Sequence, residues 1–144
     1  MMLSTPITQQ GECEASMKWR SLVPILDVRD VDVSIEFYCG VLGFSLQDKV
    51  EWGGKTEWAL LYSEHVQLML SASQSGDSEE VIHHNGDGMF FLYHDNLESL
   101  RGKLVARGYG YLTNGLPSGD GTLDFYLRDP DGYVLWFSSK RMAA

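Results

Sequence analysis

The chain has 144 residues, of which 44% are hydrophobic, so it can enclose one sizeable core or two small modules that share one. Its 20 acidic and 11 basic residues give a formal charge of −9, which argues against nucleic acid or an anionic membrane as a partner. Two cysteines are too few for a disulfide framework, and no signal peptide or membrane-length apolar run is found, so we expect a cytoplasmic protein.

The N-terminal third is predicted to contain an arm, a strand and a helix. Residues 1–17 are polar and show neither helical nor strand periodicity, which predicts a flexible N-terminal arm. A first module is expected over residues 18–72, and it opens with the β-rich run Leu22–Val28. Asp30 is suited to cap a helix whose apolar residues recur with helical spacing, and Gly43 is placed to end it.

The rest of the first module is predicted to be three strands. Residues 44–52 alternate loosely between apolar and polar side chains, and Gly53-Gly54 forms a turn. Residues 57–71 contain two strand-like runs around a polar turn, which predicts a hairpin. The module therefore has the order βαβββ. Residues 73–88 are rich in Ser, Asp, Glu and Gly and are expected to be a linker.

The second module, residues 89–140, is predicted to repeat the same order. Asp95 or Asn96 would cap its helix and Gly108 would end it. Its strands are expected at 89–93, at 110–113 and in a hairpin over 124–138, with a loop at 115–121. The turn of this hairpin, Asp129-Pro130-Asp131-Gly132, combines residues that favour tight turns.

Two βαβββ modules indicate an internal duplication, because a shift of 67 residues carries Glu57–Ser71 onto Asp124–Ser138. The predicted fold class is α+β, with the modules contributing to a curved mixed sheet. A four-stranded module cannot bury its sheet alone, so the modules must pack against each other or against those of a second chain. We expect a homodimer.

Three motifs resemble the glyoxalase, bleomycin-resistance and extradiol-dioxygenase superfamily, which is also called vicinal oxygen chelate. The motifs occur in the family's order and are LVPILDVRD at Leu22–Asp30, FY and VLGF within Phe37–Phe44, and RDPDGY at Arg128–Tyr133. The resemblance implies paired modules whose sheets curve into a cup that is completed in a homodimer. It places the site on the concave face and the helices outside.

Metal-dependent members of that family place His, Gln or Glu ligands at four strand positions. The corresponding positions here are Val23, Met69, Met89 and Trp136. Sites for Zn²⁺ or Ni²⁺ need nitrogen and oxygen donors, which Val and Trp side chains in such positions do not supply, and a Met thioether suits only soft metals. We therefore predict no metal ion and no other cofactor.

No catalytic residue is assigned from the sequence. His83 and His84 in the linker are candidates for metal ligands or acid–base groups that reach over the cup, but solvated loop residues are the favoured interpretation. His65 and His94 are expected in a turn and at a strand end. Cys39 is interpreted as a small buried hydrophobe rather than a nucleophile.

Aromatic and methionine side chains are concentrated on the inferred cup. The resemblance puts its ligand positions Met69, Met89 and Trp136 on the concave face, and strand alternation from Met89 then adds Phe91 and Tyr93. Trp58 and Phe125 are equivalent under the 67-residue shift and are expected to face the cup too. Core packing between the halves is the alternative for each single residue. The predicted ligand-binding residues are Trp52, Trp58, Met69, Met89, Phe91, Tyr93, Phe125 and Trp136.

Such a pocket is typical of a site for a flat, apolar or cationic small molecule. The resemblance to the metal-free bleomycin-resistance branch implies a non-enzymatic binding protein that sequesters a planar cationic antibiotic or a similar compound. The alternative is a metal-dependent lyase or dioxygenase with relocated ligands. The donors for such a site would be Glu57, Asp124, His83 and His84.

Overall fold

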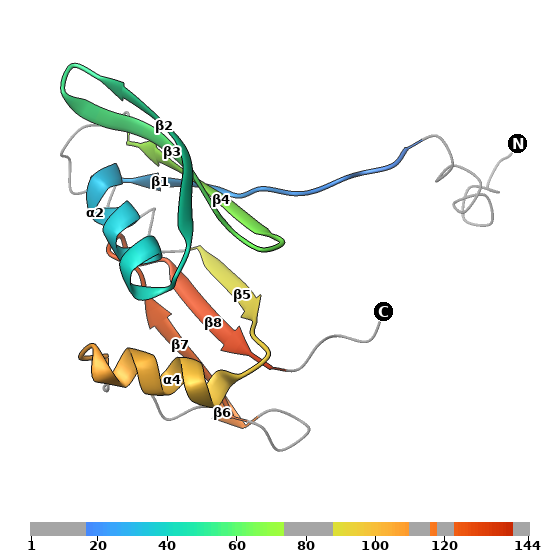
Figure 1. The fold of residues 1–144 in the computed structure, drawn as a ribbon. Helices are drawn as coiled ribbons and strands as arrows, with labels where there is room; N and C mark the ends of the chain where they lie inside the picture. Colours follow the sequence, from blue (N-terminus) through green and yellow to red (C-terminus); the bar gives the residue numbers. More distant parts are fainter. Residues whose placement is uncertain (1–16, 74–87, 110–115, 118–122, 140–144) are drawn as a thin grey trace, which may run out of the picture.

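The computed structural model describes residues 17–73, 88–109, 116–117 and 123–139, so nearly all of the predicted arm and linker lie outside the described residues. Figure 1 shows the arrangement of the elements. The first module contains β1 (Ile25–Val28), α2 (Val31–Ile35), the π-helix η2 (Glu36–Val41), β2 (Ser45–Trp52), β3 (Lys55–Ser63) and β4 (Val66–Ala72). The second contains β5 (Met89–Tyr93), α4 (Leu97–Ala106), β6 (Leu116–Pro117), β7 (Leu123–Arg128) and β8 (Val134–Ser138).

The first helix begins and ends where the sequence predicts. The Asp30 carboxylate accepts hydrogen bonds from the backbone N–H groups of Asp32 (3.0 Å) and Val33 (3.2 Å), which satisfies two donors of the first turn. The helix then widens into η2, and Gly43 follows with a φ of +81°, a conformation that glycine adopts without steric strain. The continuous helix α2–η2 buries Tyr38 against the core.

The second module departs from the prediction in one strand. Asn96, rather than Asp95, caps α4, because its side-chain oxygen accepts a hydrogen bond from the Ser99 N–H at 3.0 Å. The predicted strand at 110–113 lies outside the described residues. A two-residue strand, β6, occupies Leu116–Pro117 inside the predicted loop 115–121 and pairs with β7. Proline is tolerated there because β6 lies at the edge of the sheet.

The fold is α+β and contains two four-stranded mixed sheets with the same topology, as the duplication predicts. The strand orders are β1-β4-β3-β2 and β5-β8-β7-β6. In each sheet the first strand of the module pairs in parallel with the last, and the hairpin strands pair antiparallel. Within the described ranges, no helix has the length and apolarity that a membrane crossing requires.

Each sheet has one face in the core and one open face. The core faces carry alternate residues of the strands, and both modules contribute to one apolar cluster that also includes residues of the helices. Its most buried members include Leu26, Val28, Tyr38, Ala59, Leu61, Leu70, Leu104 and Leu127. The open faces carry the residues at the intervening positions, such as Met69 in β4 and Trp136 in β8.

The turn Asp129–Tyr133, between β7 and β8, docks on the first module, and we call it the docking turn. The Asp131 carboxylate accepts hydrogen bonds from the backbone N–H (2.9 Å) and Nε (3.3 Å) of Arg29. The Tyr133 hydroxyl donates to the backbone carbonyl of Asp27 at 3.2 Å. These contacts join the region between β1 and α2 to the final hairpin, so they fix one module against the other.

A buried hydrogen bond from Tyr38 to Asp129 forms the centre of this junction. The Tyr38 hydroxyl donates to Asp129 Oδ2 at 2.7 Å, and the backbone N–H groups of Asp131 and Tyr133 each donate to Oδ1 at 2.9 Å. Burial raises the pKa of Asp129 above its ordinary value, although the three donors act in the opposite direction. Burial, followed by the neighbouring Asp129 charge, also raises the pKa of Tyr38.

Candidate ligand-binding site

Three aromatic rings form a continuous strip across the open face of the second sheet. Phe91 in β5, Trp136 in β8 and Tyr126 in β7 are direct cross-strand partners. The ring centroids of Phe91 and Trp136 are 5.5 Å apart, and those of Trp136 and Tyr126 are 5.9 Å apart with an interplanar angle of 21°. Phe91 is 57% exposed and Tyr126 is 44% exposed. We call these three residues the aromatic platform.

Two predicted residues lie beside the aromatic platform on the same strand. Met89 and Tyr93 flank Phe91 at alternate positions of β5, so their side chains share its face. Both are about half exposed. The platform therefore continues along β5 as a row of apolar side chains that a bound molecule can contact.

Phe125 lies on the opposite face of the second sheet, so its predicted position on the open face is wrong. Its cross-strand partner is Phe137, and the two ring centroids are 5.2 Å apart. Phe125 is only 4% exposed and belongs to the core. The neighbouring residue Tyr126 occupies the open face in its place, and sequence reasoning missed it.

The remaining predicted residues belong to the first sheet. Met69 lies on the open face between its register partners Ile25 and Leu60, and Trp58 lies beside Ser71 in the same register. Trp52 ends β2 and is 77% exposed next to the Gly53-Gly54 turn. These three residues are separate from the aromatic platform, because they belong to the other sheet.

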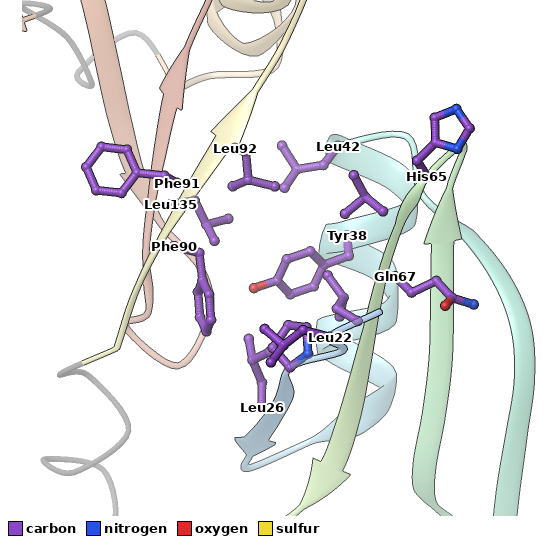
Figure 2. A pocket seen from close by; sticks show the side chains of 13 residues that line it. Leu22, Leu26, Tyr38, Leu42, His65, Gln67, Phe90, Phe91, Leu92 and Leu135 are labelled. Atoms are coloured by element: carbon purple, nitrogen blue, oxygen red, sulfur yellow. The ribbon is translucent and has the colours of Figure 1, made fainter. Parts of the chain in front are cut away.

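The two open faces point away from each other within one chain. Figure 2 shows Phe91 on the far side of β5 and Gln67 beyond β4, each directed away from the space between the modules. Gln67 shares the open face of the first sheet with Met69 by strand alternation. A single chain therefore does not combine the two groups of predicted residues into one cup.

The positions that correspond to the family's metal ligands carry no carboxylate or imidazole. Val23 precedes β1, Met69 pairs with Ile25, and Trp136 pairs with Phe91. Among the residues that the structure describes, no group of three or more His, Cys, Asp or Glu side chains is arranged to hold a metal ion. The donors present at the open faces are thus few and scattered.

The other candidate donors are located away from the aromatic platform or outside the described residues. Glu57 lines a polar cavity of ≈ 360 Å³ together with Arg29, Asp32 and Lys55 near the start of α2. His83, His84 and the side chain of Asp124 lie outside the described residues.

The remaining nucleophile and base candidates are in ordinary structural positions. His94 Nδ1 accepts a hydrogen bond from the Asn96 N–H at 2.9 Å, and His65 is exposed in the β3–β4 turn. Cys39 is half-buried, and burial raises the pKa of its thiol, which disfavours the thiolate.

The sequence profile of the Glyoxalase/Bleomycin resistance protein/Dioxygenase superfamily matches residues 23–137. No curated protein matches the chain.

Many solved structures have a similar fold, and three of them follow. A bleomycin resistance determinant encoded on the transposon Tn5 is 22% identical, with a TM-score of 0.63 over 83% of this chain and 96% of that chain. A bleomycin-binding protein from bleomycin-producing Streptomyces verticillus, complexed with copper(II)-bleomycin, is 18% identical, with a TM-score of 0.65 over 87% of this chain and 99% of that chain. TnmS3, an antibiotic binding protein from Streptomyces sp. CB03234, is 18% identical, with a TM-score of 0.59 over 84% of this chain and 96% of that chain.

Proposed function

Because the chain belongs to the Glyoxalase/Bleomycin resistance protein/Dioxygenase superfamily, we propose that it is a metal-independent binding protein that sequesters a planar cationic antibiotic or a similar compound. The observation that carries the proposal is the aromatic platform of Phe91, Trp136 and Tyr126. Stacked rings of this kind contact a flat molecule over a large area. They also attract a cation through the negative faces of the rings.

The charge of the chain supports a cationic ligand. A formal charge of −9 raises the local concentration of cations and accelerates their association, and this effect weakens as salt screens it. Contact of a cation with a desolvated tryptophan ring contributes about 1–2 kcal/mol of binding free energy and is less sensitive to salt. We therefore assign affinity mainly to the platform and the association rate mainly to the acidic charge.

The comparison structures include proteins described as complexes with bleomycin or as antibiotic binding proteins. In this chain the family's metal-ligand positions carry apolar or thioether side chains, which do not form a Zn²⁺ or Ni²⁺ site. A protein that binds a small molecule without catalysing a reaction fits both the comparison structures and the side chains at these positions.

We also propose that the site is completed in a homodimer. Each open face leaves apolar side chains uncovered in a single chain: Ile25, Val50 and Tyr62 on the first sheet, and Met89, Phe91 and Tyr126 on the second. Soluble monomers rarely expose apolar patches of this kind. The open face of the first sheet of one chain would cover that of the second sheet of its partner, which would bring Trp58 and Met69 opposite the platform.

The experiment is a tryptophan-fluorescence titration with a panel of planar cationic antibiotics at low and high salt. We expect Trp136→Ala to remain folded by circular dichroism and to bind about ten- to thirtyfold more weakly at either salt concentration. Trp58→Ala tests the first sheet in the same way. Trp19→Ala removes a tryptophan that is 88% exposed ahead of β1 and controls for loss of signal alone.

Two results would contradict this function. One is wild-type affinity in both Trp58→Ala and Trp136→Ala. The other is a panel in which no compound binds while a turnover assay on the same protein gives product, which would favour the lyase or dioxygenase alternative.

A further inference from the structure

An apolar cavity lies between the two modules, and residues at the β3–β4 turn contribute to its lining. Its volume is ≈ 240 Å³. One wall belongs to the first module and includes Leu26, Tyr38 and Leu42. The other wall belongs to the second module and includes Phe90 and Leu92 of β5 and Leu135 of β8. Figure 2 shows Phe90 and Leu92 directed across the gap toward the first module, while the ring of Phe91 points away from it. Phe91 nevertheless contributes to the lining of the cavity, whereas Trp136 and Tyr126 of the aromatic platform do not.

The lining is mainly apolar. None of the described residues that line the cavity is Asp, Glu, Lys or Arg, and the polar side chains among them are those of Tyr38, His65 and Gln67. The hydroxyl of Tyr38 already donates to Asp129, so the tyrosine offers a guest mainly its ring. Gln67 at the rim is engaged with Gln47, its side-chain nitrogen lying 3.3 Å from the Gln47 oxygen. A cationic guest would therefore lose its water without gaining an anionic partner among these residues.

The docking turn explains why the modules do not close over this space. Its hydrogen bonds to Arg29 and Tyr38 set the separation of the modules at one end of the junction. β1 and β5 are both edge strands, and they do not pair with each other, so no ladder of hydrogen bonds draws them together. The apolar walls face each other across a gap that the side chains of the described residues leave open.

We propose that this inter-module cavity is a second binding site, which takes a neutral bicyclic aromatic molecule about the size of naphthalene. An engineered apolar cavity of about 150 Å³ admits benzene, so the larger volume here has room for a further ring. The rings of Tyr38 and Phe90 provide aromatic edges and faces for contact with the guest. The site differs from the aromatic platform in charge preference, because the platform favours a cation and the cavity excludes one.

The test uses two probes of the same shape, neutral 1-methylnaphthalene and cationic N-methylquinolinium. Methyl NMR of the wild-type protein follows Leu42, Leu92 and Leu135 in the cavity walls. We expect 1-methylnaphthalene to shift these methyl signals with saturation and to bind there at least about tenfold more tightly than N-methylquinolinium. This comparison needs no substitution.

Two variants then locate the site. Leu92→Trp fills the cavity from a half-buried position and should weaken 1-methylnaphthalene binding at least about tenfold. Tyr126→Ala alters the platform on the other face and should leave binding in the cavity unchanged. Absence of a saturable shift up to the solubility limit, equal affinity for the two probes, or wild-type affinity in folded Leu92→Trp would each overturn the proposal. If Leu92→Trp does not fold, the wild-type comparison decides.

Discussion

The hydrogen bond between Tyr38 and Asp129 is a buried contact at the junction between the modules. Its two residues are buried, and the oxygen atoms lie 2.7 Å apart. Hydrogen bonds to a charged group contribute about 1.5–3 kcal/mol to stability. We therefore expect Tyr38→Phe, which removes only the hydroxyl, to lower the free energy of unfolding by about 1–3 kcal/mol in urea denaturation. An unchanged free energy would show that the junction does not depend on this contact.

The decrease in the free energy of unfolding caused by Tyr38→Phe should depend on pH. The Tyr38 hydroxyl lowers the pKa of Asp129 in the folded protein, so the stability it contributes is present when Asp129 is ionised and is lost as pH falls through the folded pKa. Burial raises that folded pKa, so the loss begins above the ordinary range of about 4. The difference between wild type and Tyr38→Phe should be full at pH 8 and should shrink on acidification. Tyr62→Phe, on the open face, is the matched control.

Local residue roles could be predicted from the sequence, but long-range partners could not. The roles of Asp30 at the start of the first helix and of Gly43 at its end could be predicted from helix capping rules. Each residue acts on backbone groups within a few positions of itself. Asp129 lies in the predicted tight turn, where its carboxylate accepts a hydrogen bond from the Tyr133 backbone N–H. Its bond to Tyr38 spans 91 positions, and no local pattern encodes a contact over that separation.

At the level of the strands, the register of β7 decides which neighbouring side chain meets a ligand. Tyr126 is on the open face and Phe125 is in the core. We expect Phe125→Ala to lower the free energy of unfolding by about 3–5 kcal/mol, because it leaves a cavity. Tyr126→Ala should change stability by less than about 1 kcal/mol and should weaken a platform ligand about three- to tenfold.

Urea denaturation and the fluorescence titration together check this pair. The ligand affinity of Phe125→Ala is measured without urea, at a temperature at which the variant is folded. If Phe125→Ala had little effect on stability and Tyr126→Ala a large one, β7 would be shifted by one residue from the register described here.

The error in placing Phe125 has a simple geometric cause. A shift of 67 residues carries Met69 onto Trp136, but their cross-strand partners Leu60 and Tyr126 are 66 residues apart. The two turns differ in length, since Ser63 pairs with Val66 in the first hairpin and Arg128 pairs with Val134 in the second. Because side chains alternate along a strand, one residue of offset moves each side chain to the opposite face.

For the whole molecule, the uncovered sheet faces predict self-association. We expect sedimentation to give twice the mass of the chain at about 10 μM, because the faces expose large apolar side chains. Ile25→Asp adds a charge to the open face of the first sheet and should shift the protein toward the monomer. Val105→Asp alters a comparably exposed residue on α4 and should leave the association unchanged. A compact wild-type monomer would contradict the dimer.

The duplication and the βαβββ order of the elements could be predicted at this scale because they follow from periodicity, turn residues and the family resemblance. How the two modules are placed could not, since it depends on the docking turn and on side chains of the core cluster that are distant in sequence. The outward direction of the two open faces follows from that placement. This is why the predicted residues divide between two surfaces.

The docking turn also has a consequence for the order of events during translation. The last strand of the first module ends at Ala72. Arg29 of this module binds Asp131, which lies 102 positions after Arg29 in the chain. At about 5–20 residues per second, the ribosome needs several seconds to deliver that turn after the first module has emerged. During that interval the docking surface of the nascent first module lacks its partner turn and is exposed to water and to chaperones, so the two modules can dock only after Asp131 has been synthesised.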